Sequence, residues 1–357
     1  MSKKIILTGG GTAGHVTPNI ALIPHLKEAG YEIVYIGSYD GIEKRLISDF
    51  PDIPYYGIAT GKFRRYLDVK NLTDPFRVVK GFAEAKKILK KEKPDILFSK
   101  GGFVSVPVVR AAASLHIPCI IHESDMTPGL ANKLCISSAK KVCCNFPETL
   151  KMLPEKKAVL TGSPIREELS GGNKIAAFEL CNFTASKPVI MVVGGSLGAA
   201  SVNQIVRKAL DKLLEDFQVI HICGKDKVDE QLLNVNGYKQ FEYLKTELKD
   251  VFAMADVIIS RAGANAICEL LALKKPNLLV PLPASSSRGD QLLNAASFES
   301  QGFSMVVQEE SLTPDLLVEK VQELYFTRQI YIDAMNASMQ MSSIDSIMKL
   351  IETEARS

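Results

Sequence analysis

The chain has 357 residues, which is about the length of two domains of 150–200 residues each. Hydrophobic residues make up 46% and charged residues 23%, and no run of about 18 apolar residues is present that would span a membrane as a helix. The formal net charge is only +3, which excludes a strong electrostatic partner for the protein as a whole, so no nucleic-acid partner is expected.

In the first half, short apolar runs alternate with helical patterns. In chain order, the pattern predicts a strand at residues 4–7, a helix at 18–29, a strand at 32–36, a helix at 76–91, a strand at 95–98, a helix at 106–115 and strands at 118–122, 141–144 and 158–160. Apolar strands that alternate with helices indicate a parallel sheet covered on both faces.

The second half repeats this alternation after a linker region at residues 170–174. The pattern predicts strands at 188–193, 218–222, 240–243, 257–260, 277–281 and 304–307, helices at 202–214, 248–253, 265–273 and 290–301, and a mostly helical tail at 314–354.

Both halves open with a strand that runs into a glycine-rich turn, at residues 9–15 (GGGTAGH) and 194–199 (GGSLGA). This repeat predicts an α/β fold of two tandem Rossmann-like, doubly wound domains, at residues 1–164 and 165–339, with a C-terminal helix at about 340–357 that packs back on the first domain. Ligands bind at the carboxyl ends of the strands in such sheets. We therefore expect the active site in the cleft between the domains.

The first glycine turn matches the dinucleotide-binding pattern G-x-G-x-x-G, but it lacks the other half of that signature. A carboxylate is needed about 20 residues on, at the end of the second strand, and the sequence there has none before Asp40. The turn is therefore expected to bind a different ligand through its backbone amides. His15 follows directly and can act as a general base near neutral pH; the alternative is a capping or core histidine.

Other candidates lie after later strands. The hydroxyl of Ser196 and the amides around it suit a diphosphate, or Ser196 caps a tight turn. Glu269 can accept hydrogen bonds from both ribose hydroxyls, or form a helix salt bridge. Asp290 and Gln291 begin a helix and can reach a sugar, and Arg166 either clamps a leaving diphosphate or pairs on the surface. The acids show no metal-ligand spacing, so no metal is expected.

The seven cysteines are scattered without a C-x-x-C pair, which favours buried reduced thiols over a metal site. The apolar run near the N-terminus, residues 5–7, is too short for a signal peptide. We therefore expect a cytosolic protein that keeps its N-terminus.

Seven ordered blocks make the chain resemble the MurG family across nearly its whole length. They are GGGTAGHVTPN from Gly9, KGGFVSVPV from Lys100, HESDMTPGLANK from His122, GSPIRE from Gly162, GGSLGA from Gly194, SRAGANAICE from Ser260 and GDQLLNA from Gly289. The resemblance implies a GT-B fold and an inverting transfer of N-acetylglucosamine from UDP-N-acetylglucosamine, without a cofactor. The implied acceptor is lipid I, undecaprenyl-diphosphate-N-acetylmuramoyl-pentapeptide, attacked through its 4-hydroxyl to give lipid II in peptidoglycan synthesis.

The resemblance also implies roles for particular residues. The family's donor contacts correspond to Thr12, Ala13, Gly14, Arg166, Ser196, Leu244, Ala264, Asn265, Glu269, Asp290 and Gln291. The family's candidate base corresponds to His15, and Asp125 or Glu123 stays open as the base. Four positions depart from the family pattern: Ala13 replaces a usual Gly, Asp125 replaces Asn, Asp290 replaces a Gln of some members, and Ser163 replaces a common Asn.

Residues 62–93 contain eleven Lys or Arg against four acids, interleaved with aromatic and aliphatic residues. Such a surface suits peripheral docking on the anionic cytoplasmic face of the cell membrane, where the implied acceptor is anchored. The alternative is a solvated basic helix packed on its sheet.

Rival functions are another UDP-sugar-dependent lipid glycosyltransferase, such as a diacylglycerol glucosyltransferase, and a UDP-N-acetylglucosamine epimerase. From other classes come a dinucleotide-binding oxidoreductase or regulator and a non-enzymatic membrane scaffold. The glycine turn with His15 and the block from His122 argue against the first two. The missing acid after the second strand argues against an oxidoreductase or regulator. The presence of Glu269, Gln291 and His15 argues against a non-enzymatic scaffold.

Overall fold

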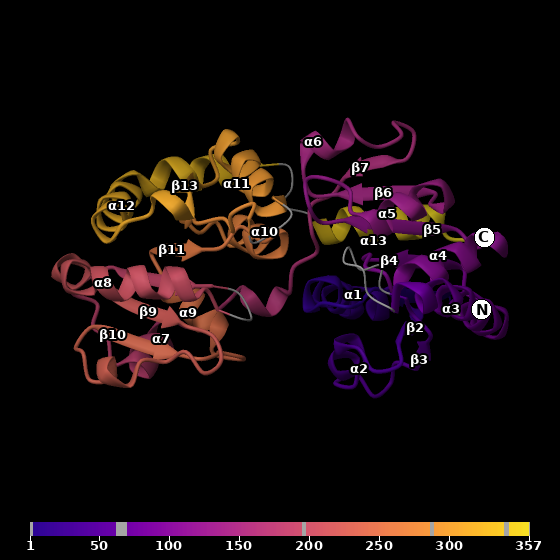
Figure 1. Cartoon of the computed structure of the whole chain (residues 1–357), viewed down its shortest axis with the longest axis horizontal. Helices are drawn as coiled ribbons and strands as arrows, with labels where there is room; N and C mark the ends of the chain where they lie inside the picture. The colour runs from indigo at the N-terminus through magenta and orange to yellow at the C-terminus, as the bar shows by residue number, and fades with distance from the viewer. Residues whose placement is uncertain (1–2, 62–69, 195–197, 286–288, 339–342, 357) are drawn as a thin grey trace. The chain divides into compact units, whose positions relative to one another are not determined.

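A computed structural model describes residues 3–61, 70–194, 198–285, 289–338 and 343–356. The chain divides into two compact units (Figure 1): unit 1 is Met1–Arg166 with Ser342–Ser357, and unit 2 is Glu167–Met341. The predicted fold class of two tandem doubly wound α/β domains is confirmed.

Unit 1 contains a seven-stranded sheet in which every pair is parallel, in the order β3-β2-β1-β4-β5-β6-β7. Its strands are β1 (Lys3–Thr8), β2 (Tyr31–Ser38), β3 (Tyr55–Ile58), β4 (Ile96–Ser99), β5 (Cys119–Glu123), β6 (Lys141–Cys144) and β7 (Ala158–Leu160). Its helices are η1 (Ala13–His15), α1 (Thr17–Glu28), α2 (Ile42–Ile47), α3 (Lys70–Glu92), α4 (Ser105–Ser114), α5 (Leu130–Cys135), η2 (Ile136–Ser138), α6 (Pro147–Leu150) and α13 (Ser343–Glu354).

Alternate residues of each strand enter the cores on opposite faces of the unit 1 sheet. Ile6 packs with α3, α4 and α5, while Ile5 and Leu7 pack with α1, α2 and α13. This explains why the central strands are apolar throughout, since neither of their faces meets water. The C-terminal helix α13 completes the second layer, because Ile347 and Ile351 are fully buried in it.

Unit 2 contains a six-stranded parallel sheet in the order β10-β9-β8-β11-β12-β13. Its strands are β8 (Val189–Val193), β9 (Gln218–Ile222), β10 (Tyr238–Phe241), β11 (Val257–Ser260), β12 (Asn277–Leu279) and β13 (Met305–Val306). Its helices are η3 (Glu167–Leu169), α7 (Lys174–Cys181), α8 (Ala200–Asp216), η4 (Glu230–Leu232), α9 (Leu248–Met254), α10 (Ala264–Ala272), α11 (Asp290–Ser300), η5 (Glu309–Ser311) and α12 (Pro314–Asn336). Helices α8 and α12 share one core with the sheet.

The two sheets reverse their strand order at equivalent places, next to β1 in unit 1 and next to β8 in unit 2. A ligand in such a sheet binds at this reversal, beyond the carboxyl ends of the strands. Both glycine-rich turns follow these two strands. The fold therefore puts each turn at the ligand-binding edge of its own sheet.

The linker predicted at residues 170–174 is wrong at its end, because α7 begins at Lys174 with Asn173 capping it through hydrogen bonds from the amides of Ile175 and Ala176. All seven cysteines are buried and free of disulfides. Among the described residues, no helix is long and apolar enough to cross a membrane.

Candidate functional site

Buried polar side chains form hydrogen bonds to the backbone at the start of the first glycine turn and fix its position. The hydroxyl of Tyr35, on β2, donates to the carbonyl of Gly9 at 2.7 Å. The side-chain amide of Asn19, on α1, donates to the carbonyl of Thr8 and to the Tyr35 hydroxyl. Asn19 and Tyr35 are fully buried, so these bonds hold the turn at the end of β1 without competition from water.

Glu43, on α2, organises the same turn and was not a candidate from the sequence. Its fully buried carboxylate accepts hydrogen bonds from the backbone N–H of Gly11 at 3.1 Å, and from the N–H and hydroxyl of Ser38 at 2.9 and 2.5 Å. A Cβ at Gly10 or Gly41 would collide with this carboxylate. The glycines of the turn therefore make room for a buried acid that fixes the turn from one side.

His15 lies at the end of η1, half-buried, with Nδ1 at 3.0 Å from the hydroxyl of Thr12. Burial of the ring, together with the positive charge of Lys100, lowers its pKa to about 4. The imidazole is therefore neutral at pH 7. A neutral imidazole is the form that accepts a proton, as a general base must.

Lys100 follows β4 and is 1% exposed. Its ammonium contacts Nδ1 of His122 at 2.8 Å and donates to the hydroxyl of Ser124 at 2.6 Å. Nε2 of His122 lies 2.8 Å from the carbonyl of Gly162, so Nε2 carries the proton and Nδ1 accepts from Lys100. A buried cation thus lies at the carboxyl ends of β4 and β5 and ties them together.

Of the alternative bases, Glu123 is the last residue of β5 and Asp125 lies on the turn that follows it. The carboxylate of Glu123 is buried and accepts four hydrogen bonds of 2.8–3.0 Å, from the N–H groups of Ser124, Asp125 and Gly129 and from the side chain of Asn132. These bonds engage both carboxylate oxygens, so Glu123 shapes the turn in this structure. Asp125 is half-buried on the same turn.

In unit 2, the candidate donor residues gather at the carboxyl edge of β11 and its neighbours. Ala264 begins α10 and is buried, whereas Asn265 and Glu269 on that helix are half-buried. Gln291 is half-buried on the first turn of α11, beside Asp290, and its side-chain oxygen accepts from the N–H of Leu282 at 3.1 Å. Leu244, in the segment after β10, is buried.

Arg261 is a residue of this edge that the sequence analysis missed. Its guanidinium is 8% exposed and donates to the carbonyls of Val280 and Pro281 and to the hydroxyl of Ser201. It also pairs with Glu309. One side chain thus links the ends of β11 and β12 to the start of α8, which follows the second glycine turn.

Ser196 lies outside the residues that the structure describes, but both ends of its turn are described. A Cβ at Gly194 would collide with the backbone of Ala199, and a Cβ at Gly198 would overlap the carbonyl of Cys223, after β9. Gly198 also has φ = +68°, a conformation that favours glycine. The described ends of the turn are therefore closely packed, Gly194 against Ala199 and Gly198 against the neighbouring strand end.

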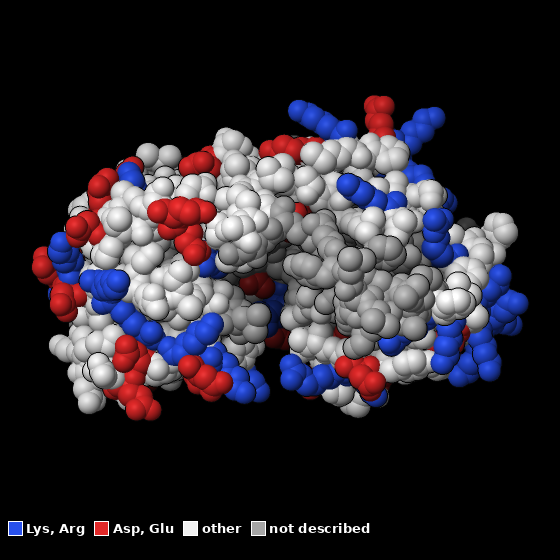
Figure 2. All heavy atoms as spheres, in the orientation of Figure 1, with Lys and Arg blue, Asp and Glu red and all other residues white. Residues whose placement is uncertain are grey.

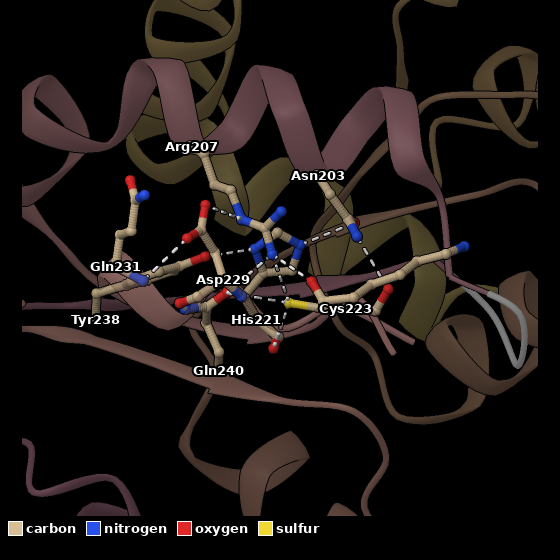
Figure 3. Close-up of polar contacts among 9 residues, drawn as sticks. Asn203, Arg207, His221, Cys223, Asp229, Gln231, Tyr238 and Gln240 are labelled. Atoms are coloured by element: carbon tan, nitrogen blue, oxygen red, sulfur yellow. Dashed lines mark hydrogen bonds and ion pairs between the residues drawn. The ribbon is translucent and has the colours of Figure 1, made fainter. Parts of the chain in front are cut away.

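A buried polar network lies behind that strand end (Figure 3). Asn203 and Arg207 point from α8 toward β9, where His221 bonds to Tyr238 and Asn203 at 2.8 and 3.0 Å. Arg207 donates to the carbonyl of Lys227 and to the side chain of Gln240. Burial lowers the pKa of His221 to about 3, so this imidazole is neutral as well.

Comparison with known proteins identifies the family. The model of the glycosyltransferase family 28 N-terminal domain matches residues 5–144, and the model of its C-terminal domain matches residues 189–351. A curated relative from Lachnospira eligens is 65% identical over 99% of this chain and 100% of its own length. It is named UDP-N-acetylglucosamine--N-acetylmuramyl-(pentapeptide) pyrophosphoryl-undecaprenol N-acetylglucosamine transferase, as is a relative from Clostridium novyi that is 59% identical over 99% of each chain. The chain belongs to the MurG family of glycosyltransferases.

A solved structure agrees with this assignment. The crystal structure of Acinetobacter baumannii MurG has a TM-score of 0.77 and 29% sequence identity, and the match covers 98% of this chain and 99% of that one. A putative UDP-N-acetylglucosamine 2-epimerase from Listeria monocytogenes has a TM-score of 0.72 at only 12% identity, which shows a shared fold alone. As a MurG family member, the chain is a glycosyltransferase rather than an oxidoreductase or a scaffold.

The family's positions fall in both units. Thr12, Ala13, Gly14 and His15 lie together on the first glycine turn of unit 1, and Arg166 is the last residue of that unit before the chain enters unit 2. Leu244, Ala264, Asn265, Glu269, Asp290 and Gln291 lie in unit 2. No cluster of three or more His, Cys, Asp or Glu suited to a metal ion occurs within the described ranges.

Proposed function

We propose that this protein transfers N-acetylglucosamine from UDP-N-acetylglucosamine to the 4-hydroxyl of the N-acetylmuramoyl sugar of lipid I, giving lipid II and UDP. The observation that carries this proposal is the full-length identity of 57–65% to relatives that all bear the name of this transferase. The two glycine turns and the neutral imidazole of His15 suit the chemistry.

The reaction is a single displacement with inversion. The 4-hydroxyl oxygen of the acceptor attacks the anomeric carbon of the donor sugar, the bond from that carbon to the UDP oxygen breaks, and UDP leaves with the electron pair. The hydroxyl proton passes to His15, which is neutral because burial and Lys100 lower its pKa to about 4. Asp125, half-buried on the turn after β5, is the second candidate base, and Glu123, the last residue of β5, is the third.

Unit 2 supplies the donor-binding groups in this proposal. The carboxylate of Glu269 accepts from the ribose hydroxyls, and the residues that begin α10 and α11 contact the nucleotide sugar: Ala264, Asn265, Asp290 and Gln291. Leu244 belongs to the same set of donor contacts. Ser196 and Arg166 stabilise the charge that grows on the leaving diphosphate, with the amides of Thr12, Ala13 and Gly14 on the sugar side.

Transfer of radiolabelled N-acetylglucosamine to a lipid I analogue tests the main proposal. The full chain should convert the analogue to a labelled disaccharide product only when UDP-N-acetylglucosamine is the donor, with UDP released in equal amount. A β-linked product from the α-linked donor confirms inversion. Transfer to diacylglycerol instead, or epimerisation of the donor without transfer, contradicts the proposal.

We further propose that unit 1 docks peripherally on the anionic cytoplasmic face of the cell membrane through α3. Phe76 and Val79 on this helix are 78% and 68% exposed, three residues apart, although they are large and apolar. Arg77 and Lys80 flank them, and Lys and Arg side chains gather at the edge of unit 1 where α3 lies (Figure 2). Apolar side chains amid a basic surface suit binding to anionic lipid. The part of the basic stretch at residues 62–69 lies outside the described residues.

Charge reversal of four basic residues on α3, Lys86, Lys87, Lys90 and Lys91, to Glu should weaken binding to vesicles that contain anionic phospholipid at least about tenfold, since each basic residue contributes about 1 kcal/mol near such a surface. Binding to neutral vesicles should stay low. The matched control reverses four exposed lysines of unit 2: Lys187, Lys208, Lys212 and Lys274. Unchanged binding of the α3 variant, or an equal loss in the control, contradicts docking through α3.

A further inference from the structure

We propose that Asn203 is a positioning residue for the donor's diphosphate, because it fixes the strand end against which the second glycine turn packs. This inference rests on the proposed function, in which that turn contacts the diphosphate of UDP-N-acetylglucosamine. Asn203 does not touch the donor in this account; it acts through Cys223 and Gly198.

Gly198, at the end of the second glycine turn, packs directly against the carbonyl of Cys223 at the strand end. Gly198 lies so close to the carbonyl of Cys223 that even a Cβ would overlap it. The position of this carbonyl therefore sets the position of Gly198, and Gly198 directly precedes Ala199 and the start of α8. A shift of Cys223 is therefore expected to displace Gly198 and the amide groups at the beginning of this 17-residue helix, which contact the diphosphate in the proposed function.

Asn203 holds that carbonyl in place. Its Nδ2 donates to the Cys223 carbonyl at 2.9 Å, and its Oδ1 lies 3.0 Å from Nε2 of His221. Because Oδ1 can only accept, His221 carries its proton on Nε2, and its Nδ1 accepts from the hydroxyl of Tyr238 at 2.8 Å. The four groups form a directional chain from β10 through β9 and α8 to the turn (Figure 3).

The chain is buried and uncharged. Asn203 is 2% exposed, Tyr238 is 3% exposed, and His221 and Cys223 are not exposed at all. The pKa of His221, lowered to about 3 by burial, agrees with a neutral ring. Since every donor of the chain has an acceptor and the groups are buried, removing one member leaves an unsatisfied partner, and the rest must rearrange.

Unit 1 contains a comparable arrangement at its own glycine turn, although its asparagine bonds to the end of the strand before the turn rather than to the end of the second strand. Asn19 lies five residues after Gly14, as Asn203 lies five residues after Gly198. Asn19 is also buried near the start of a helix, and it donates both to a strand-end carbonyl, that of Thr8, and to the hydroxyl of Tyr35 on the second strand of the sheet. An asparagine at one spacing from both glycine turns indicates a common task in positioning these turns.

The test compares the affinities of the full chain for UDP and for uridine, which lacks the diphosphate. UDP binding is measured by calorimetry, and uridine binding by displacement of UDP. In Asn203→Ala we expect the Kd for UDP to rise about tenfold, as for the loss of one charge-assisted hydrogen bond, while the Kd for uridine stays within about twofold of wild type. Tyr238→Phe removes only the first donor of the hydrogen-bonded chain, and should therefore raise the Kd for UDP by a smaller factor. This variant tests the inference if Asn203→Ala does not fold.

The matched control is Asn277→Ala. Asn277 is also buried and donates Nδ2 to two carbonyls, of Lys275 and Phe303, but it lies at the amino end of β12, away from the turns. It should leave the ratio of the two Kd values unchanged. An unchanged ratio in both Asn203→Ala and Tyr238→Phe, or an equal loss of UDP and uridine affinity, overturns the inference. Wild-type protein that binds no UDP refutes the proposed function itself, and the inference with it.

Discussion

Replacing Glu43 should damage unit 1 and the transfer reaction while leaving donor binding by unit 2 intact. Glu43 is fully buried and lies on α2, and its carboxylate is the acceptor for the Gly11 N–H of the first glycine turn. Two substitutions separate its effects. Glu43→Ala removes the acceptor and leaves space, whereas Glu43→Gln keeps the size and one of the two oxygens.

The magnitudes follow from the three hydrogen bonds at 3.1, 2.9 and 2.5 Å. In Glu43→Ala, the N–H groups of Gly11 and Ser38 lose their acceptor, and each unsatisfied buried donor costs about 1–3 kcal/mol. The Ser38 hydroxyl can rotate to another partner. We expect the free energy of unfolding of unit 1 to fall by about 2–5 kcal/mol in Glu43→Ala and by about 1–3 kcal/mol in Glu43→Gln, in which one N–H group meets an amide donor.

Calorimetric unfolding with and without UDP distinguishes the two units, because most of the proposed UDP contacts lie in unit 2 and UDP therefore raises mainly the transition of that unit. For Glu43→Ala we expect three results. The unfolding transition that UDP raises less should occur at a lower temperature, which assigns the loss of stability to unit 1. The kcat should fall at least tenfold, while the Kd for UDP should stay within about twofold of wild type. The control Glu92→Gln changes a carboxylate that binds Tyr56 and Lys4, next to the amino end of β1. It should lower stability without lowering kcat. A stable, fully active Glu43→Ala, or an equal loss of kcat in the control, refutes this reasoning.

Three further predictions concern the general base, the ribose contact of Glu269 and the pH dependence of stability. His15→Ala should lower kcat about 100- to 10,000-fold, the usual contribution of a general base, with the Kd for UDP unchanged in calorimetry; full activity would make the base assignment wrong. Glu269→Ala should raise the Kd for UDP about 10- to 100-fold through the lost ribose hydrogen bonds, and an unchanged Kd would contradict that contact. Burial lowers the pKa of His15 and His221 from 6.5 to about 4 and about 3, and that of His122 well below 6.5. The unfolded chain therefore binds protons first, so these contributions to stability are complete above pH 6.5 and decrease as the pH falls. Urea titrations at pH 7.5 and 5 should show a loss of about 2 kcal/mol for each of the imidazoles of His15 and His221, with His122 adding a loss in the same direction. Equal stability at both pH values would contradict the buried neutral rings.

The central strands of both sheets were predictable because they are buried on both faces and therefore apolar throughout. The edge strand β3 was not, since only Ile58 of its four residues is buried and the run carries no apolar pattern. Helix α2 was missed for a related reason. It has only six residues, and the two that it buries are Glu43 and Ile47. A buried glutamate is polar in sequence, so the helix shows no apolar repeat that would predict it.

For the site, the sequence pointed to residues next to glycines and missed the residues that hold them. His15 stands beside the turn in the sequence and is easily found. Glu43 lies 32 residues from its partner Gly11, and Asn203 lies 18 residues from its partner His221. No local spacing connects such pairs, because the parallel fold brings them together only after a crossover. The available signal was the set of glycines around Glu43, Gly37 and Gly41 among them, which leave no room for a side chain.

The two glycine turns are fixed by a similar asparagine but in different electrostatic settings, and the difference fits their proposed tasks. Behind the turn of unit 2, the groups from Tyr238 to Asn203 are themselves neutral. The charge beside them is the guanidinium of Arg207, which adds to the effect of burial in lowering the pKa of His221. A setting with a cation and helix amides suits a diphosphate that is anionic throughout. Around the turn of unit 1, a buried acid and a buried lysine act on His15 in opposite directions, Glu43 raising its pKa and Lys100 lowering it. A base must change its charge during the reaction, and fixed charges of both signs allow its pKa to be tuned without moving the turn. Preorganised neutral bonds therefore suit the binding half of the site, and buried charges suit the half that transfers the proton.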